Sequence, residues 1–167
     1  MNKSNSDIQA QLFADDDIGN CEFIDITPNS NDIPNGFQAY IKHSSCFWCA
    51  YIKIPRNHPD FLSDESIENT INIYSPHGNE WTYDDLYNIK SNSYRLSISD
   101  SDSYVFGIDF AHLEISDWIP FCESTDDDKT YPINDMLSPN SYVYRDRDYA
   151  TNEILRLLHI AIQRYNP

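Results

Sequence analysis

Three histidines and one aspartate occupy positions where a rigid element should give way to a loop. His58 lies between two prolines in IPRNHPDF, and His77 lies in the Pro/Gly turn of YSPHGNEWTY. Asp109 and His112 close the apolar stretch VFGIDFAH. Imidazoles can act as general base and general acid near neutral pH, and a carboxylate can fix the tautomer of one of them. We therefore expect these four side chains to converge as a catalytic site at one end of a sheet.

Arginine and aromatic side chains near these positions are candidates for ligand binding. Arg56 can hold an anionic group through two parallel hydrogen bonds. Arg95 is expected to be a diagonal neighbour of Asp109, and Trp81 or Tyr83 can stack on a ring. These groups suit a small phosphate-bearing molecule such as a nucleotide. The residues leave open whether it is only bound; if it is cleaved, the protein is a hydrolase or lyase using histidine acid–base chemistry.

A metal ion is the less favoured interpretation of the same residues. Three histidines and a carboxylate can bind zinc or manganese, but no two of them share an i, i+2 or i, i+4 spacing. Cys46 and Cys49 of CFWC lack the second pair that a zinc site requires. We therefore expect no cofactor, and we expect all four cysteines to be reduced thiols. The glycine-rich phosphate-binding motifs and the common hydrolase motifs are absent.

Short β-like runs separated by turn clusters must position these residues. The candidate strands are, in order, 21–26, 37–43, 46–54, 70–75, 94–99 and 103–110. Apolar residues at helical spacing from Ile154 to Tyr165 predict a C-terminal helix with Asp148 as its N-cap. A shorter helix is expected over 81–89, with Thr82 as its N-cap.

Together these elements predict an α+β fold: a single domain with a mostly antiparallel sheet of five to seven strands, packed by the C-terminal helix. Residues 46–54 are apolar on both faces and should form a central strand covered on both sides. Residues 1–20 are polar and acidic and are expected to be frayed, which leaves the domain at 21–167.

The runs 94–99 and 103–110 are predicted to pair as a hairpin. Their apolar faces meet in a register that centres the loop on Ser101. In that register Gly107 lies beside Asp109 without a side chain and leaves room above the carboxylate.

The charge balance limits the partners. The 167 residues include 11 Lys and Arg against 27 Asp and Glu, a formal net charge of −16. Direct nucleic-acid binding is disfavoured because it needs clustered cations against phosphates, and an anionic membrane surface is disfavoured for the same reason. The N-terminus has no signal-peptide run and no stretch approaches the ~20 apolar residues of a membrane span. We therefore expect a cytoplasmic protein, and its oligomeric state stays open.

Four blocks of the chain resemble small uncharacterised proteins of phages and prophages. Those proteins carry P..HP, VHGGLTY, FGFDCAH and YRD before a final helix, and the corresponding stretches here are AYIKIPRNHP (50–59), YSPHGNEWTY (74–83), FGIDFAH (106–112) and YRDRDYA (144–150). The resemblance covers roughly residues 45–165. Asn79 and Glu80 replace a glycine and an apolar residue, and Phe110 replaces a cysteine, which speaks against a cysteine nucleophile there. The resemblance implies a mobile-element protein in a host cytosol, where a nucleotide messenger of host immunity would be a fitting target; it implies no particular reaction.

Two alternatives from other classes stay open. The acidic charge could imitate a nucleic-acid backbone, so that the protein inhibits a basic host protein by electrostatic steering. Binding of that kind would depend strongly on salt and not on the histidines. Alternatively, the chain is a structural or interaction domain without a site, and each singled-out residue is satisfied by its own neighbours.

Overall fold

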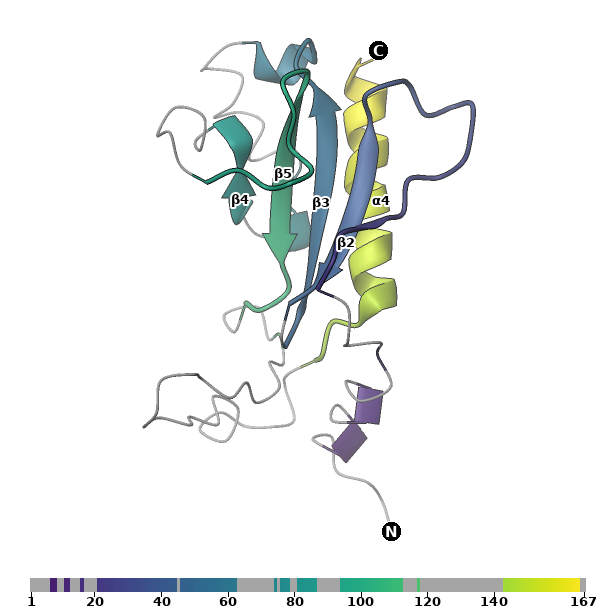
Figure 1. The fold of residues 1–167 in the computed structure, drawn as a ribbon. Helices are drawn as coiled ribbons and strands as arrows, with labels where there is room; N and C mark the ends of the chain where they lie inside the picture. Colours follow the sequence, from purple (N-terminus) through teal and green to yellow (C-terminus); the bar gives the residue numbers. More distant parts are fainter. Residues whose placement is uncertain are drawn as a thin grey trace.

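The computed structural model describes residues 7–8, 11–12, 16, 21–44, 46–62, 74, 76–78, 81–86, 94–112, 117 and 143–165. They form a five-stranded sheet in the order β1-β2-β3-β5-β4, packed against the C-terminal helix α4 (Figure 1). All strand pairs are antiparallel. The predicted α+β fold, a single domain with a mostly antiparallel sheet packed by the C-terminal helix, is confirmed.

Most strands follow the predicted runs. β1 spans Ile24–Asp25, β2 Gln38–His43, β3 Trp48–Pro55, β4 Tyr83–Asp84 and β5 Ser103–Asp109. Two short 3-10 turns, η1 at Pro59–Phe61 and η2 at Pro76–Gly78, lie in the connections, and α4 spans Arg147–Tyr165. β3 pairs with both β2 and β5, so the run that contains it is central as predicted. Of the candidate strand 70–75, the structure describes only Tyr74.

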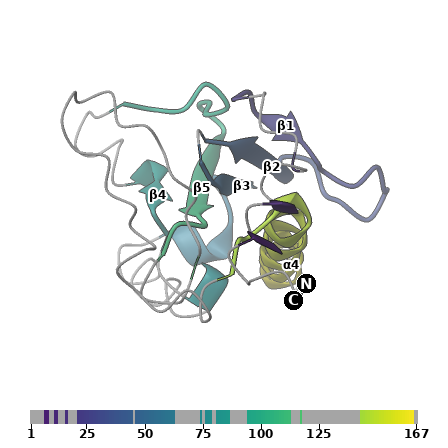
Figure 2. The same cartoon turned by 90° about the horizontal axis from the view of Figure 1, so that it is seen from below.

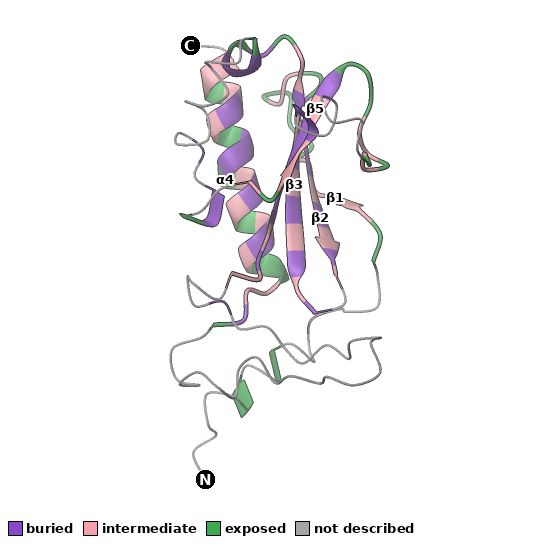
Figure 3. Ribbon diagram, turned by 90° about the vertical axis from the view of Figure 1, so that its left-hand side faces the viewer, coloured by how far each residue is buried: buried purple, intermediate pink, exposed green. Residues whose placement is uncertain are grey.

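Burial alternates along β3 because successive side chains point to opposite faces of the sheet. The inward residues from Trp48 to Ile54 are at most 1% exposed, whereas Cys49 and Tyr51 on the other face are only partly buried (Figure 3). The predicted cover is therefore complete on the inward face of this strand and partial on the other face. α4 lies on one face of the sheet, against β2 and β3 (Figure 2).

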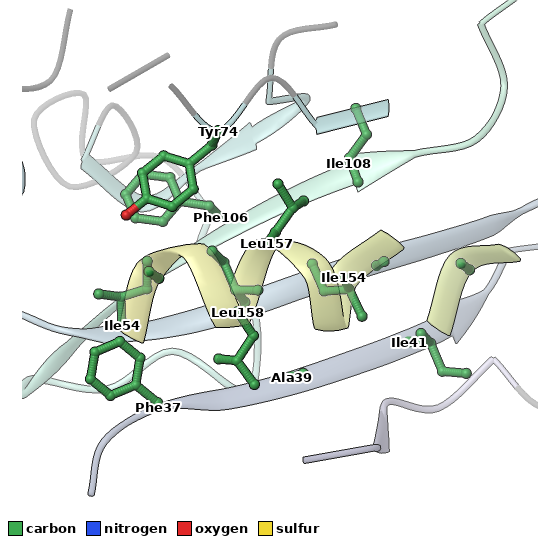
Figure 4. Packing of buried hydrophobic residues seen from close by; sticks show 14 of the residues in the cluster. Phe37, Ala39, Ile41, Ile54, Tyr74, Phe106, Ile108, Ile154, Leu157 and Leu158 are labelled. Atoms are coloured by element: carbon green, nitrogen blue, oxygen red, sulfur yellow. The ribbon is translucent and has the colours of Figure 1, made fainter. Parts of the chain in front are cut away.

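An apolar stripe fixes α4 to the sheet. Ile154, Leu157 and Leu158 are at most 1% exposed and pack over the inward face of the sheet (Figure 4). Burying each such side chain contributes about 1.5–3 kcal/mol, so the position of the helix is well determined. The N-cap is Asp146 rather than Asp148, because the Asp146 Oδ1 accepts the Tyr149 backbone N–H at 2.8 Å.

The predicted hairpin between 94–99 and 103–110 is wrong. Residues 94–99 are not a strand, and β5 pairs with β3 and with β4 through Tyr83↔Gly107. The space beside Gly107 is not open either, since a Cβ there would overlap the Tyr51 ring. Alternating apolar residues predicted a strand at 94–99, but side-chain hydrogen bonds determine the conformation of this segment.

Those contacts converge on Asp85, which is fully buried. Its carboxylate accepts hydrogen bonds from Arg95 Nη2 at 3.2 Å and from the Val105 N–H at 2.9 Å. The Ser99 hydroxyl donates to the same carboxylate at 3.1 Å. The buried Asp85 carboxyl group thus ties the loop to the backbone of β5.

The short helix predicted at 81–89 begins later than expected. Tyr83 and Asp84 form β4, and the Thr82 hydroxyl accepts the Asp109 N–H at 3.0 Å rather than capping a helix. Asp84 Oδ1 instead accepts the Leu86 N–H at 2.7 Å. Residues 87–89 lie outside the described residues.

The cysteines do not all follow the prediction of reduced thiols. Cys21 and Cys49 are free, but Cys46 is disulfide-bonded. Cys122 lies outside the described residues. Among the helices described, none combines the length and the apolar character that crossing a membrane would require.

Candidate acid–base site

His77 is held more tightly than an ordinary turn residue. It lies in η2 with φ 51° and ψ 29°, the left-handed region that side chains other than glycine rarely adopt. Its backbone N–H donates to Glu153 Oε1 at 2.6 Å, so α4 holds this conformation in place. Residues kept in such sparsely populated regions cluster at functional sites.

Both ring nitrogens of His77 are engaged. Nε2 lies 2.8 and 2.9 Å from the two carboxylate oxygens of Asp117, and Nδ1 lies 2.6 Å from the Tyr149 hydroxyl. Because an ionised carboxylate can only accept, Nε2 carries the proton and donates it to Asp117. In the neutral ring Nδ1 is then the acceptor and the Tyr149 hydroxyl donates to it. Tyr149, His77 and Asp117 form a continuous hydrogen-bonded chain.

Asp117 anchors this chain as a fully buried anion. It also accepts hydrogen bonds from Arg145 Nε at 2.9 Å and from the His112 backbone N–H at 3.0 Å. Burial acts to raise the pKa of Asp117, but the hydrogen bonds from His77, Arg145 and His112 outweigh it, and the pKa is lowered. The carboxylate is therefore ionised at neutral pH.

A second histidine and a second carboxylate lie beside the first pair. The His112 ring centroid is 6.1 Å from that of His77, and His112 Nε2 lies 3.4 Å from Asp109 Oδ1. His77, Asp109 and His112, three of the four predicted catalytic residues, are thus brought together.

Two further side chains of the cluster are only partly buried. The Arg145 guanidinium lies 4.6 Å over the Tyr149 ring, and its side chain is 23% exposed. Within the described part of the chain, the terminal nitrogens of Arg145 make no hydrogen bond. Burial raises the pKa of Tyr149, and Arg145 offsets only part of this increase. The Tyr149 hydroxyl therefore keeps its proton at neutral pH. His77 and Asp117 lie behind these groups, with side chains 2% and 0% exposed.

The positions follow from three elements that meet at one end of the sheet. Tyr149 and Glu153 are four residues apart and share one face in the first turns of α4, and Arg145 lies two residues before the helix begins at Arg147. This end of α4 lies at the end of the sheet where β5 finishes (Figures 1 and 2). β5 and the residues directly after it supply Asp109 and His112. We call these residues, with His77 and Asp117, the acid–base site.

His58 lies elsewhere, so the prediction that four side chains converge is wrong for this residue. Its Nε2 lies 2.8 Å from the Ala161 carbonyl, and its ring stacks on Tyr165 at a centroid distance of 5.7 Å. Ala161 comes eight residues after Glu153, which is roughly 12 Å along the helix. His58 is buried, caps η1 and has a pKa lowered chiefly by that burial.

The predicted ligand-binding arginines also lie away from the acid–base site. Arg56 stacks on Tyr104 at 5.0 Å, near the start of β5. The length of β5 places that end roughly 20 Å from Asp109. Arg95 pairs with Asp85 at 3.2 Å and not with Asp109, which follows from the absence of the predicted hairpin.

Trp81 and Tyr83, which were predicted to stack on a ring of the ligand, contact other side chains of the protein instead. Trp81 packs on Tyr74 and Phe106, at centroid distances of 6.3 and 5.7 Å. The Tyr83 hydroxyl donates to Asp85 at 2.8 Å. These contacts belong to the core and to the loop around Asp85, not to the acid–base site.

Sequence reasoning missed four members of the site: Asp117, Arg145, Tyr149 and Glu153. A usable signal existed for three of them, because 149 and 153 share a helix face and the block YRDRDYA contains 145 and 149. Asp117 gave no such signal, since it lies outside every strand and helix that the sequence predicts; in the structure it forms a bridge with Val143.

No protein-family model matches this chain, and neither the curated proteins nor the solved structures compared with it give a match. Within the described residues, no group of three or more His, Cys, Asp or Glu side chains is arranged to hold a metal ion. The chemistry of the site is therefore argued from its own residues.

Proposed function

We propose that the protein binds a small phosphate-bearing molecule at the acid–base site and transfers protons to and from it. The observation that carries this proposal is the buried His77, whose two ring nitrogens contact Tyr149 and Asp117 at 2.6 and 2.8 Å. A histidine between an ionised carboxylate and a hydroxyl is the arrangement by which a hydroxyl group gains or loses a proton readily.

We assign a role to each side chain of the hydrogen-bonded chain from how far it is buried. His77 and Asp117 have almost no exposed side-chain area, whereas Tyr149 is only partly buried, so we assign the contact with the ligand to the Tyr149 hydroxyl. It takes a proton from an attacking water or ligand hydroxyl while its own proton passes to His77 Nδ1. The resulting imidazolium is stabilised by Asp117, and the reverse transfer returns the proton to the departing oxygen. The reaction class is then hydrolysis or elimination at an oxygen leaving group.

The partly buried side chains around Tyr149 are the candidates for holding the ligand and for further proton transfer. Arg145 is bound to Asp117 only through Nε among the described residues, so its terminal nitrogens are available to a phosphate. His112 and Asp109, whose Nε2 and Oδ1 lie 3.4 Å apart, offer a second imidazole and carboxylate beside His77. A ligand held by Arg145 would thus have proton-transfer groups on two sides.

A thermal-shift survey of the full chain tests the binding step. The panel contains inorganic phosphate, sugar phosphates, and linear and cyclic nucleotides, among them nucleotide messengers because of the resemblance to phage proteins. A ligand at 100 times its Kd stabilises the folded state by about 2.7 kcal/mol, which raises Tm by roughly 5–10 °C for a chain of this size. We expect such a shift, and we expect Arg145→Gln to lose it while Arg147→Gln, an exposed arginine two residues on, keeps it.

The ligand found in this way then tests the chemistry. Tyr149→Phe removes only the hydroxyl and should abolish turnover while leaving the ligand-induced Tm shift. Tyr165→Phe is the matched control, because it makes the same change near the other end of α4. Equal turnover by Tyr149→Phe and wild type would overturn the proposed mechanism.

The survey also separates the other classes. If no phosphate-bearing compound shifts Tm and the protein instead binds a basic protein in a salt-dependent manner, unchanged by Arg145→Gln and His77→Gln, the acidic-inhibitor alternative replaces this proposal. If neither kind of partner binds, the proposal fails and a structural role is left.

A further inference from the structure

The charges around Tyr149 are mostly negative. In the acid–base site, Asp109, Asp117 and Glu153 carry carboxyl groups, and Arg145 is the one arginine. Burial acts to raise the pKa values of Asp117 and Glu153, but the hydrogen bonds that each accepts outweigh it, and both pKa values are lowered. Counted with neutral imidazoles, the site therefore has three negative charges against one positive charge.

Two of these carboxylates already use the guanidinium groups nearby. Glu153 accepts hydrogen bonds from Arg156 Nη2 at 2.7 Å and Nε at 2.9 Å, so the charges of this pair balance each other. Arg145 Nε donates to Asp117 at 2.9 Å. The charge of Arg145 is therefore balanced by Asp117 before a ligand binds, and Asp109 adds a further negative charge.

The N-terminal end of α4, whose dipole favours negative charge, is already bound by carboxylates of the chain. Asp146 Oδ1 accepts the Tyr149 N–H at 2.8 Å, and Asp16 Oδ2 accepts the Arg147 N–H at 3.1 Å. The net charge of −16 adds a negative potential over the whole molecule. A ligand at Tyr149 thus meets one paired guanidinium in negative surroundings.

We infer that the ligand of the acid–base site is a phosphate diester and not a phosphate monoester. A diester carries one negative charge at neutral pH, whereas a monoester carries about 1.5–2. The terminal nitrogens of Arg145 can hold a singly charged phosphate group through two hydrogen bonds. The second charge of a monoester would face Asp109 and Asp117 without a cation of its own. This inference rests on the proposed function, because it names the class of ligand for the same site.

The proton-transfer groups favour the same class of ligand. In the hydrolysis of a diester, the water oxygen forms a new P–O bond, the ester P–O bond breaks, and the departing alkoxide takes up the proton that the water loses. This reaction needs a proton acceptor and a proton donor, which Tyr149 and His77 supply in the proposed mechanism. Transfer of the phosphoryl group of a monoester instead spreads charge over its oxygens, and enzymes stabilise that charge chiefly with cations.

A matched pair of nucleotides tests the inference in the full-length chain. Adenosine 5′-monophosphate and its methyl ester differ only in the esterification of one phosphate oxygen, and adenosine reports binding without a phosphate. Dissociation constants are measured from the ring-proton NMR signals of His77 and His112, at pH 7.5 and at pH 5.0 and at the same ionic strength of about 0.1 M. The second proton of a monoester binds with a pKa of about 6, so at pH 5.0 both nucleotides carry nearly the same charge.

At pH 7.5 we expect the methyl ester to bind at least about tenfold more tightly than the monophosphate. A tenfold change corresponds to about 1.4 kcal/mol, close to the interaction of two unit charges roughly 10 Å apart at an effective dielectric constant of about 20. At pH 5.0 the two dissociation constants should agree within about threefold. Because the methyl group is present at both pH values, the change in the ratio reports the charge of the ligand.

Removing one carboxylate of the site provides a second measurement. Asp109→Asn keeps the size of the side chain and removes one negative charge, so it should tighten binding of the monophosphate at pH 7.5 more than binding of the ester. Asp102→Asn is the matched control, because Asp102 is exposed and directly precedes β5, at the end of the strand roughly 20 Å from Asp109. That separation exceeds the Debye length of about 10 Å at this ionic strength.

The outcomes separate this inference from the proposed function. If the monophosphate binds as tightly as the ester at pH 7.5, if their ratio is the same at pH 5.0, or if Asp109→Asn behaves like Asp102→Asn, the inference is wrong. Weaker binding of either nucleotide by Arg145→Gln would still support the proposed phosphate site in that case. If neither nucleotide binds more tightly than adenosine and Arg145→Gln changes nothing, the inference and the proposed function both fail.

Discussion

Replacing Asp117 by alanine tests how much the acid–base site contributes to the free energy of unfolding. The Asp117 carboxylate is fully buried and accepts hydrogen bonds from Arg145, His77 and the His112 amide at 2.8–3.0 Å. Removing one partner of a buried ion pair costs about 3–5 kcal/mol, because the remaining charge is left uncompensated. We therefore expect Asp117→Ala to lower the free energy of unfolding by about 3–5 kcal/mol, a large part of the 5–15 kcal/mol typical of a folded domain.

Urea denaturation of the full chain measures this change, with Asp109→Ala as the control. The Asp109 side chain is 32% exposed and its contact with His112 is 3.4 Å long, so its loss should cost at most about 1 kcal/mol. If Asp117→Ala is no more destabilising than Asp109→Ala, the hydrogen-bonded network does not hold the site as described.

The pH dependence of the stability shows which protonation state of Asp117 stabilises the fold. The pKa of Asp117 is lowered in the folded state, so the ionised carboxylate stabilises the protein above its unfolded pKa of about 3.9. This contribution is lost as the pH falls through the lower folded value. The difference in stability between wild type and Asp117→Asn should therefore be constant near neutrality and shrink below about pH 4. A difference that is independent of pH down to acid unfolding would contradict the assignment of an ionised Asp117.

Three further predictions concern the frame of the site. Gly107→Ala would force a methyl group into the Tyr51 ring and should destabilise the protein by about 1–3 kcal/mol in urea; no loss would show that the ring moves freely. Leu157→Ala should cost about 2–5 kcal/mol in the same assay, because Leu157 is fully buried between α4 and the sheet. Burial raises the pKa of the Cys49 thiol to about 12. At pH 8 iodoacetamide should therefore modify Cys49 about a thousandfold more slowly than a thiol of ordinary pKa, with the exposed Cys21 labelled first in a mass spectrum.

The fold was largely predictable because it depends on regular periodicity. The apolar run that forms β3 and the helical spacing of Ile154, Leu157 and Leu158 are local patterns that the sequence displays directly. The strand predicted at 94–99 failed because a non-local interaction decides its conformation. Asp85 is buried and gathers that loop through side-chain hydrogen bonds, which no local periodicity reveals.

The site was predictable only in part, for a similar reason. His77, Asp109 and His112 stand at the ends of elements, and topology brings those ends together. His58 also follows a strand, but it lies at the opposite end of the sheet. In an antiparallel sheet, the end at which a strand finishes can be predicted only when the pairing of the strands is known. Asp117 lies outside every strand and helix that the sequence predicts, and it was therefore missed.

Long-range proton–nitrogen NMR of the histidine rings can detect the hydrogen-bonded chain from Tyr149 through His77 to Asp117. At pH 8 we expect His77 in the Nε2–H tautomer, with a ring proton protected from exchange that disappears or shifts strongly upfield in Asp117→Asn. Tyr149→Phe should perturb the Nδ1 signal and leave the Nε2 proton in place. A His77 ring in the Nδ1–H tautomer, or one whose ring protons exchange freely with water in the folded wild-type chain, would show that this hydrogen-bonded chain does not exist.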